Sequence, residues 1–381
     1  MFGASRSWLD STTLKVNDLM ATSEQLLQAL QSVIDPNTGK DFVSTKVLKN
    51  LQVEDGNVSF DVELGYPAKS QIPALRQALI AAAKGVAGVS NVSANVISKI
   101  TAHAAQRGVA LLPQVKNIVA VASGKGGVGK STTAVNLALA LAAEGAKVGL
   151  LDADIYGPSQ PMMMGIEGRP ESEDGQTMEP MENYGVQVMS IGFLVNQDEA
   201  MIWRGPMATQ ALEQLLRQTN WKELDYLIVD MPPGTGDIQL TLSQRVPMTG
   251  AVIVTTPQDI ALLDAKKGVK MFEKVGVPIL GLVENMAVHV CTQCGHVEHI
   301  FGADGGKKMA AEYGMDYLGA LPLNMQIRVQ ADSGKPTVVS DPDGEVAQIY
   351  KAVARQVAVK IAAKAKDFSA KFPTIKVSKD T

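Results

Sequence analysis

The chain has 381 residues, of which 46% are hydrophobic and 19% are charged, so it is long enough for more than one domain and too apolar for a disordered protein. Its 35 basic and 39 acidic residues give a net charge of −4, which argues against a dedicated nucleic-acid binder with a basic face. Two cysteines are too few to staple a secreted scaffold with disulfides.

No apolar run reaches the roughly 18 residues that a membrane span needs. The first residues also lack the basic start and apolar stretch of a signal peptide. We therefore expect a cytoplasmic protein that binds neither membrane nor nucleic acid.

The first part of the chain predicts a small α+β domain over residues 1–105. Two alternating segments flank Asp55-Gly56, a dipeptide that favours a tight hairpin turn because its residues tolerate positive φ. Helical patterns lie on either side of this hairpin, and a further strand pattern ends the domain. The expected helices are 22–34 and 72–86, and the expected strands are 47–53, 58–64 and 89–100.

Residues 106–116 lose clear periodicity and predict a linker, after which residues 117–381 change to alternating strand and helix patterns. Short apolar strands separated by helical stretches are typical of an α/β fold, in which a mostly parallel sheet is covered by helices on both faces. Ligands of such sheets bind at the carboxyl ends of the strands. The expected strands are 118–122, 148–151, 227–229, 251–255 and 279–283, with a helix at 132–144.

A glycine-rich segment between the first of these strands and the helix fits the P-loop pattern G-x-x-x-x-G-K-S/T. Its glycines let backbone N–H groups surround a polyphosphate, Lys130 adds charge toward the β and γ oxygens, and Ser131 supplies a hydroxyl for Mg²⁺. The sequence therefore predicts an ATP site. Its expected residues are Gly124, Lys125, Gly126, Gly127, Val128, Gly129, Lys130, Ser131 and Thr132.

Lys125 is a second lysine in the same loop. It is either an ordinary exposed lysine or a cation for a partner subunit's phosphates, because Lys130 already holds the place on its own nucleotide. The stretch from Lys125 to Thr132 resembles the deviant Walker A sequence of the MinD/ParA-type dimerising ATPases, in which this lysine crosses the dimer interface. That resemblance implies a homodimer and a catalytic role for Lys125.

Acidic residues follow two of the predicted strands. Asp154 is suited to orienting the attacking water and Asp152 to supporting it or a metal ion, although capping of a turn is the alternative for both. Asp230 ends a Walker B-like strand and is suited to holding Mg²⁺. We predict Lys125, Lys130 and Asp154 as catalytic residues, and Ser131, Asp152 and Asp230 as the magnesium site.

Both cysteines lie in one segment, Cys291-Thr292-Gln293-Cys294-Gly295. A zinc site with nearby histidines is chemically possible, but His296 and His299 follow too closely for the usual finger spacing. A redox dithiol normally opens a helix, whereas this pair lies in an expected loop. A 4Fe-4S cluster needs four thiolates, which two chains related by a two-fold axis would supply. All three interpretations remain open, and the bridging cluster is favoured.

The order of the motifs resembles the Mrp/ApbC family of iron–sulfur cluster carrier ATPases. The motifs are GKGGVGKST, LLDADIYGPS, IVDMPPGTGD, ENM, C-x-x-C-G, IFG-x-x-GG and ADSGKP, over residues 117 to about 360. The resemblance implies a P-loop NTPase fold and a homodimer that binds ATP, Mg²⁺ and a labile 4Fe-4S cluster between Cys291 and Cys294 of both subunits. It further implies that Asn285 contacts the adenine.

Under this resemblance the partners are apo iron–sulfur proteins and a cluster-assembly scaffold, and the first domain is of the iron–sulfur-assembly type. Two alternatives compete with the carrier. One is a MinD/ParA-type positioning switch on membrane or DNA, supported by the lysine-bearing helix pattern at 345–366, which we expect instead to be a terminal helix packed on the sheet. The other is an electron-transfer ATPase that carries a cluster.

Overall fold

The computed structural model describes residues 21–103, 109–195 and 205–364. The chain divides into two compact units, Met1–Lys99 and Ile100–Thr381, and each is described by itself. Part of the expected linker, residues 106–108, lies outside the described residues, and strand β4 (Val115–Ala122) already begins within its last two positions. The domain boundaries drawn from the sequence stay a prediction.

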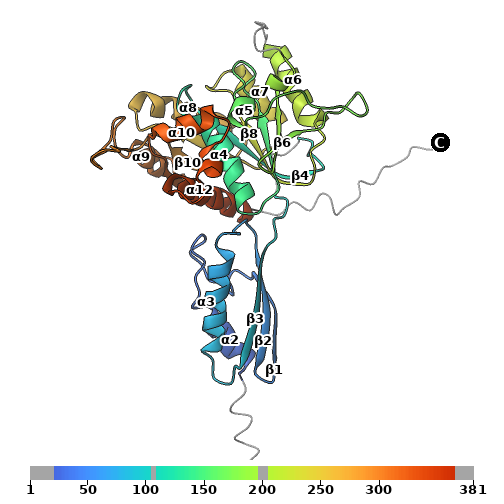
Figure 1. The fold of residues 1–381 in the computed structure, drawn as a ribbon, viewed down its shortest axis with the longest axis vertical. Helices are drawn as coiled ribbons and strands as arrows, with labels where there is room; N and C mark the ends of the chain where they lie inside the picture. Colours follow the sequence, from blue (N-terminus) through green and yellow to red (C-terminus); the bar gives the residue numbers. More distant parts are fainter. Residues whose placement is uncertain (1–20, 104–108, 196–204, 365–381) are drawn as a thin grey trace, which may run out of the picture. The chain divides into compact units, whose positions relative to one another are not determined.

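In its described residues, 21–99, the first unit has a three-stranded sheet and two helices (Figure 1). Strands β1 and β2 form the expected hairpin, and Asp55 (φ 47°) and Gly56 (φ 78°) both adopt the positive φ that the tight turn requires. Strand β3 pairs with β2 in parallel. Val62 and Leu79 are fully buried in the core of this unit. Its elements are α2 (Ser23–Leu30), β1 (Leu48–Glu54), β2 (Asn57–Leu64), α3 (Ile72–Lys84) and β3 (Asn91–Ser98).

The second unit contains an eight-stranded sheet in the order β13-β10-β9-β4-β8-β5-β7-β6. Among the strands that the structure describes in this sheet, only the pair β6–β7 is antiparallel, so the mostly parallel α/β fold is confirmed. The remaining strands are β5 (Val148–Asp152), β6 (Met181–Asn183), β7 (Val186–Ser190), β8 (Leu224–Asp230), β9 (Gly250–Thr255), β10 (Ile279–Glu284) and β13 (Tyr317–Ala320).

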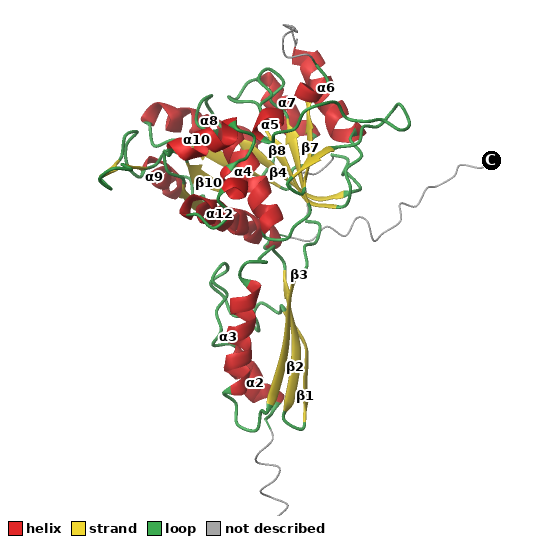
Figure 2. Cartoon of the chain, in the orientation of Figure 1, coloured by secondary structure: helices red, strands yellow, loops and turns green. Residues whose placement is uncertain are grey.

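Helices cover both faces of this sheet, as Figure 2 shows. Strands β5, β8 and β9 are buried along their whole length, which explains their near-continuous apolar sequences. The helices are α4 (Lys130–Ala143), α5 (Gln160–Met163), α6 (Gly205–Gln218), α7 (Asp237–Arg245), α8 (Asp259–Lys274), α9 (Gly305–Glu312), α10 (Met325–Asp332), α11 (Thr337–Ser340) and α12 (Glu345–Ala362).

Helix α12 packs on α4 and on the sheet, as expected for a terminal helix. Val353 and Val357 are buried along this contact. A buried ion pair of 2.5 Å between Arg355 and Glu144 fastens α12 to the end of α4. No helix in the described part of the chain is long and apolar enough to cross a membrane.

The strand order places the candidate site. Strand β4 lies between β8 and β9: the chain runs from β4 to β5 on one side, and from β8 it later crosses to β9 on the other side. Open α/β sheets bind ligands where the strand order reverses in this way. Strands β4, β8 and β5 are neighbours, and their carboxyl ends therefore bring three sequence-distant segments to one edge.

Candidate functional site

The glycine-rich loop joins β4 to α4 in the strand–loop–helix context that its sequence predicts. Gly127 and Gly129 both have φ of 81°, a backbone conformation that side-chain-bearing residues avoid, and Gly129 is the N-cap of α4. Helix α4 thus begins directly after the loop and directs its free N–H groups toward it. This arrangement is suited to binding a polyphosphate.

Lys130 stands at the centre of the charges at this edge. Its side chain is only 6% exposed, and its Nζ lies 2.5 Å from Oδ1 of Asp230 and 3.8 Å from Oδ2 of Asp154. The same ammonium donates to Oγ of Ser131 at 3.1 Å. The structure therefore brings together four of the predicted residues from three strand ends.

Asp152 is fully buried beside this group. Its carboxylate accepts hydrogen bonds from the backbone N–H groups of Asp154, Ser159 and Gln160 at 3.0–3.1 Å, and from the hydroxyl of Ser190 at 3.1 Å. These bonds cap the loop that follows β5, which is the alternative role that the sequence left open. A direct magnesium role for Asp152 stays a prediction.

Burial, the larger cause, and the neighbouring carboxylate of Asp230 together raise the pKa of Asp152 to about 7. Burial also raises the pKa of Asp154. The physical cause is that three carboxylates face one ammonium, that of Lys130, in a region of low dielectric constant. Near neutral pH this site therefore holds a proton readily.

We expect the loss of this proton with rising pH to make the nucleotide-free protein less stable. The folded pKa of Asp152 lies above its ordinary value of 3.8, so between about pH 4 and about pH 7 the folded state binds more protons than the unfolded state. Its stability then falls with rising pH over this window and levels off above it. Urea unfolding of the second unit across the window measures this.

Asp230→Asn is the matched variant for that measurement, because it removes a charge that raises the pKa of Asp152 and keeps the side chain's shape. It should shift the pH dependence toward lower pH. An unfolding midpoint that rises between about pH 4 and about pH 7 in wild type would contradict this interpretation of the site.

Gln160 is a site residue that the sequence did not indicate. It is completely buried, and its Nε2 donates to Oδ2 of Asp230 at 2.8 Å and to the backbone oxygen of Ser131 at 3.2 Å. Its Oε1 has no hydrogen-bond partner among the described residues. A lone glutamine between Ser159 and Pro161 follows no recognised pattern. Only the fold shows that it links Asp230, at the end of β8, to the backbone of Ser131 at the start of α4.

Gln160→Ala should weaken binding of magnesium nucleotide about tenfold, because Asp230 and the Ser131 backbone lose a shared donor. The matched control is Gln187→Ala, which also removes a glutamine bonded to backbone, that of Lys222, but lies on β7 outside the site. Titration of a fluorescent ATP analogue compares the two. Equal affinities of both variants would show that Gln160 only fills space.

The other predicted nucleotide residues lie around the same loop. Lys125 is exposed, and Thr132 is half-buried in the first turn of α4. Asn285 follows β10 and donates from Nδ2 to the backbone oxygen of Val128 at 2.8 Å. A Cβ on Gly129 would lie 2.1 Å from that Nδ2, so only glycine permits this contact. Adenine contact by Asn285 stays a prediction.

Both cysteines lie on a small exposed hairpin, residues 289–298, formed by β11 (His289–Val290) and β12 (Val297–Glu298), which we call the cysteine hairpin. The backbone N–H of Cys291 donates to the oxygen of His296, and that of Gly295 donates to the oxygen of Cys291. Backbone N–H groups of Gln293 and Cys294 lower the pKa of the Cys291 thiol, which favours the metal-binding thiolate.

The nearby histidines do not complete a metal site within one chain. Nδ1 of His289 bonds the backbone oxygen of Leu323 at 3.0 Å, and Nδ1 of His299 bonds that of Ala287 at 2.9 Å. His296 is exposed beside Glu298. No group of three or more His, Cys, Asp or Glu side chains in the described ranges is arranged to hold a metal ion. A single-chain site with two cysteines and two histidines is therefore not formed.

The histidine bonds instead fasten the base of the cysteine hairpin to the segments that follow β10 and β13. The backbone N–H of Leu323 also donates to the oxygen of Val288, and that of Ala287 donates to the oxygen of Leu321. Asn285 and Cys291 thus belong to one tethered segment that runs from the nucleotide loop to the cysteines.

Two family models match this chain, one over each unit. The family model described as "NUBPL iron-transfer P-loop NTPase" matches residues 114–358, and the model "Iron-sulfur cluster assembly protein" matches residues 23–96. A solved nucleotide-binding protein from Archaeoglobus fulgidus, in complex with ADP, superposes with a TM-score of 0.53 at 36% identity, covering 61% of this chain and 90% of that one.

Some of the curated relatives match both units, and others match a shorter part of the chain. The "Iron-sulfur cluster carrier protein" of Haemophilus influenzae is 49% identical over 338 residues, 88% of this chain and 91% of the relative. That of Escherichia coli K12 is 62% identical over 248 residues, covering 65% of this chain and 67% of the relative. The mouse "Iron-sulfur cluster transfer protein NUBPL" is 56% identical over 245 residues, or 64% and 77%. The chain therefore belongs to the NUBPL iron-transfer P-loop NTPase family, as its motifs predict.

Proposed function

We propose that this protein is an ATP-dependent carrier that holds a 4Fe-4S cluster between two copies of the chain and transfers it to apo iron–sulfur proteins. The observation that carries the proposal is the cysteine hairpin, which holds a half-buried thiol, Cys291, and an exposed one, Cys294, on a tethered support. The names of the relatives, carriers and transfer proteins for iron–sulfur clusters, support the same cargo.

The number of ligands supports the dimer. A cubane cluster takes four thiolates, and each chain has two cysteines. The described residues of one chain offer no third metal ligand beside Cys291 and Cys294. Two hairpins facing each other across a two-fold axis supply all four ligands, and a cluster held on surface hairpins is accessible to a client protein.

The nucleotide side supports ATP hydrolysis. Ser131 and Asp230 provide a hydroxyl and a carboxylate, the hard oxygen ligands that Mg²⁺ prefers, and Mg²⁺ would neutralise phosphate charge there. Lys130 already compensates these oxygens and is placed to bind the phosphates. Asp154 lies at the same edge, where we assign it to orient the attacking water, and exposed Lys125 acts on the partner's phosphates.

The tethered segment supports coupling between the two sites. Asn285 contacts the nucleotide loop, and Cys291 follows it by six positions on the same backbone-bonded run. A nucleotide that favours one arrangement of the loop biases the hairpin, and with it capture or release of the cluster.

The positioning switch on membrane or DNA loses its supporting feature. That alternative depended on residues 345–366 as a free lysine-bearing helix, whereas α12 is packed against α4, β10 and β13 through residue 362. Residues 365–366 of that stretch lie outside the described residues. The remaining partners, apo-proteins and an assembly scaffold, follow from the carrier function.

Anaerobic reconstitution of the full chain with ferrous iron and sulfide tests the proposal. We expect about four irons and four sulfides per two chains, an absorption spectrum of a 4Fe-4S cluster, and activation of an apo-enzyme that requires such a cluster. The apo-enzyme mixed with the same iron and sulfide alone is the control. A chain that binds one zinc ion per monomer and no cluster would overturn the proposal.

A further inference from the structure

A buried carboxylate that belongs to neither candidate site lies at the end of β10. Glu284 is only 1% exposed, and it directly precedes Asn285, which contacts the nucleotide loop. Its Oε1 accepts a hydrogen bond from the backbone N–H of Gly306 at 2.8 Å, and its Oε2 accepts one from the hydroxyl of Tyr317 at 2.7 Å. A carboxylate is stable in the protein interior only where donors compensate it, so these two contacts define what Glu284 can do.

The contact with Gly306 closes a loop of the chain. Glu284 and Gly306 are 22 positions apart, and the residues between them include the whole cysteine hairpin. We call residues 285–305 the cysteine loop. Its first residue follows Glu284 directly, and its returning arm, residues 299–305, reaches the sheet where Gly306 bonds the same side chain. Both ends of the cysteine loop therefore meet at Glu284.

Two glycines make this closure possible. A Cβ on Gly306 would lie 2.9 Å from a methyl group of Leu282 on β10. A Cβ on Gly305 would lie 2.5 Å from the backbone oxygen of Pro257, just before α8. Both glycines end the IFG-x-x-GG motif, residues 300–306. The motif thus lets the first turn of α9 lie against β10 and against the start of α8.

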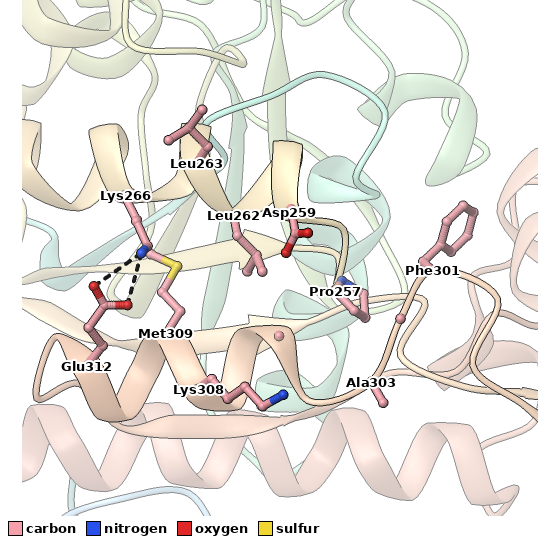
Figure 3. A pocket seen from close by; sticks show the side chains of 12 residues that line it. Pro257, Asp259, Leu262, Leu263, Lys266, Phe301, Ala303, Lys308, Met309 and Glu312 are labelled. Atoms are coloured by element: carbon pink, nitrogen blue, oxygen red, sulfur yellow. Dashed lines mark hydrogen bonds and ion pairs between the residues drawn. The ribbon is translucent and has the colours of Figure 1, made fainter.

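Helix α8 is a fixed support for this turn, because the nucleotide loop packs on the same helix. A Cβ on Gly124 would lie 2.1 Å from the backbone carbon and oxygen of Asp264. A pocket of about 490 Å³ lies between the rest of α8 and α9, and Figure 3 shows Leu262 and Met309 on its opposite sides. The position of the first turn of α9 therefore depends on its contacts with Glu284 and with the start of α8.

The charge of Glu284 suits its position. Helix α9 begins at Gly305, and the N-terminus of a helix carries a partial positive charge that stabilises a carboxylate beside it. Asp304, the N-cap, makes no side-chain hydrogen bond to this turn in the part of the chain that the structure describes, so Glu284 satisfies an N–H that the cap leaves free. Burial and the bond to Glu284 raise the pKa of the Tyr317 hydroxyl, which therefore stays a donor.

We propose that Glu284 is the positioning residue of the cysteine hairpin. Its carboxylate holds the returning arm of the cysteine loop on β10 and so keeps Cys291 and Cys294 in place to bind the cluster. A loop with one free end has many conformations, and closing it removes most of them. This inference rests on the proposed function, and it adds a residue that acts without touching the cluster or the nucleotide.

The alternative is that Glu284 only caps α9. The two roles differ in the backbone N–H groups that they protect from exchange with solvent. A cap protects α9 itself, whereas the clamp also protects the cysteine loop. There the N–H of Ala287 is bonded to the oxygen of Leu321, and that of Gly302 to the oxygen of His299.

Hydrogen exchange of the iron-free full chain tests the clamp without any cluster. In Glu284→Ala, peptides covering residues 286–303 should exchange at least about tenfold faster, while α4 and α12 keep their wild-type rates. Glu284→Gln should restore most of the protection, because its amide offers an oxygen to Gly306 and an N–H to the oxygen of Tyr317. Faster exchange confined to α9, or a Gln variant as fast as the Ala variant, would overturn the clamp.

A milder variant keeps the test decisive where Glu284→Ala does not fold. Tyr317→Phe removes one of the two donors to Glu284, so exchange of residues 286–303 should rise about threefold. Tyr184→Phe is the matched control, because its hydroxyl donates to the backbone oxygen of Gly334 at 2.9 Å, outside the cysteine loop. It should leave these peptides unchanged, and equal effects of the two tyrosine variants would overturn the clamp.

Iron release from the reconstituted full chain tests what the clamp does for the cluster. The ferrous chelator bipyridyl should remove iron from Glu284→Ala about tenfold faster than from wild type. Affinity for an ATP analogue should be unchanged, because the backbone N–H of Asn285 stays bonded to Thr255 at the end of β9.

The outcomes separate this inference from the proposed function. Faster hydrogen exchange together with wild-type iron release would overturn the positioning role of Glu284 and leave the carrier intact. A wild-type chain that never holds a cluster would overturn the carrier, and hydrogen exchange of the iron-free chain would still show whether Glu284 holds the cysteine loop.

Discussion

Replacing either Cys291 or Cys294 by alanine is expected to remove nearly all bound iron from the reconstituted protein. Each change leaves a dimer with two thiolates in place of four, too few to hold a cubane cluster firmly. Nucleotide affinity should persist, because the nucleotide loop lies on β4 and α4, away from the cysteine hairpin in sequence. Iron analysis after desalting and titration of an ATP analogue measure the two properties on the same sample.

Gln293→Ala is the matched control for the cysteine variants. It changes an exposed residue of the same turn and keeps both thiols and the backbone N–H groups that stabilise the Cys291 thiolate. It should retain its cluster. Cysteine variants that keep half or more of their iron would show that other side chains ligate the metal.

Lys130→Ala and Lys125→Ala should lose different properties, nucleotide affinity in the first and turnover in the second. Lys130 is buried against Asp230 and is placed to meet the phosphates, so its loss should weaken nucleotide binding by about a hundredfold or more. It also leaves the carboxylates of Asp230 and Asp154 without their cation. Lys125 is exposed and acts across the dimer, so its loss should leave affinity nearly unchanged and lower turnover strongly.

Steady-state ATP hydrolysis and equilibrium binding distinguish the two lysines. Lys274→Ala, at the far end of α8, is the control for loss of an exposed lysine and should change neither property. Equal loss of affinity in the Lys125 and Lys130 variants would place Lys125 on its own chain's nucleotide. Unchanged turnover in Lys125→Ala would make it an ordinary surface lysine.

Local patterns explain what the sequence could predict. The nucleotide loop is defined by consecutive glycines and Lys130, and its flanking strand and helix follow from uninterrupted apolar runs. The Asp55-Gly56 turn likewise depends only on the two residues that adopt positive φ. These features need no knowledge of the rest of the chain.

Contacts between distant segments explain what it could not predict. Strands β7 and β13 are short and are recognised by their pairing with β5 and β10, and Gln160 reaches Asp230 across 70 positions. The hydrogen bonds that make the Asp152 carboxylate a cap of the loop after β5 appear only in the fold, because aspartate suits both capping and metal binding in the sequence. The approach of Gly124 to α8 depends on where α8 packs.

A mixed dimer distinguishes a cluster that bridges two chains from a metal that each chain binds alone. One subunit is wild type, the other carries both Cys291→Ala and Cys294→Ala, and two different affinity tags isolate the mixed species after reconstitution with iron and sulfide. The bridging carrier predicts that this dimer, with two thiolates in total, holds no stable cluster, whereas the wild-type dimer with the same tags holds one. A mixed dimer that keeps a full complement of iron on its wild-type chain would show that each subunit binds its own metal, and would contradict the account.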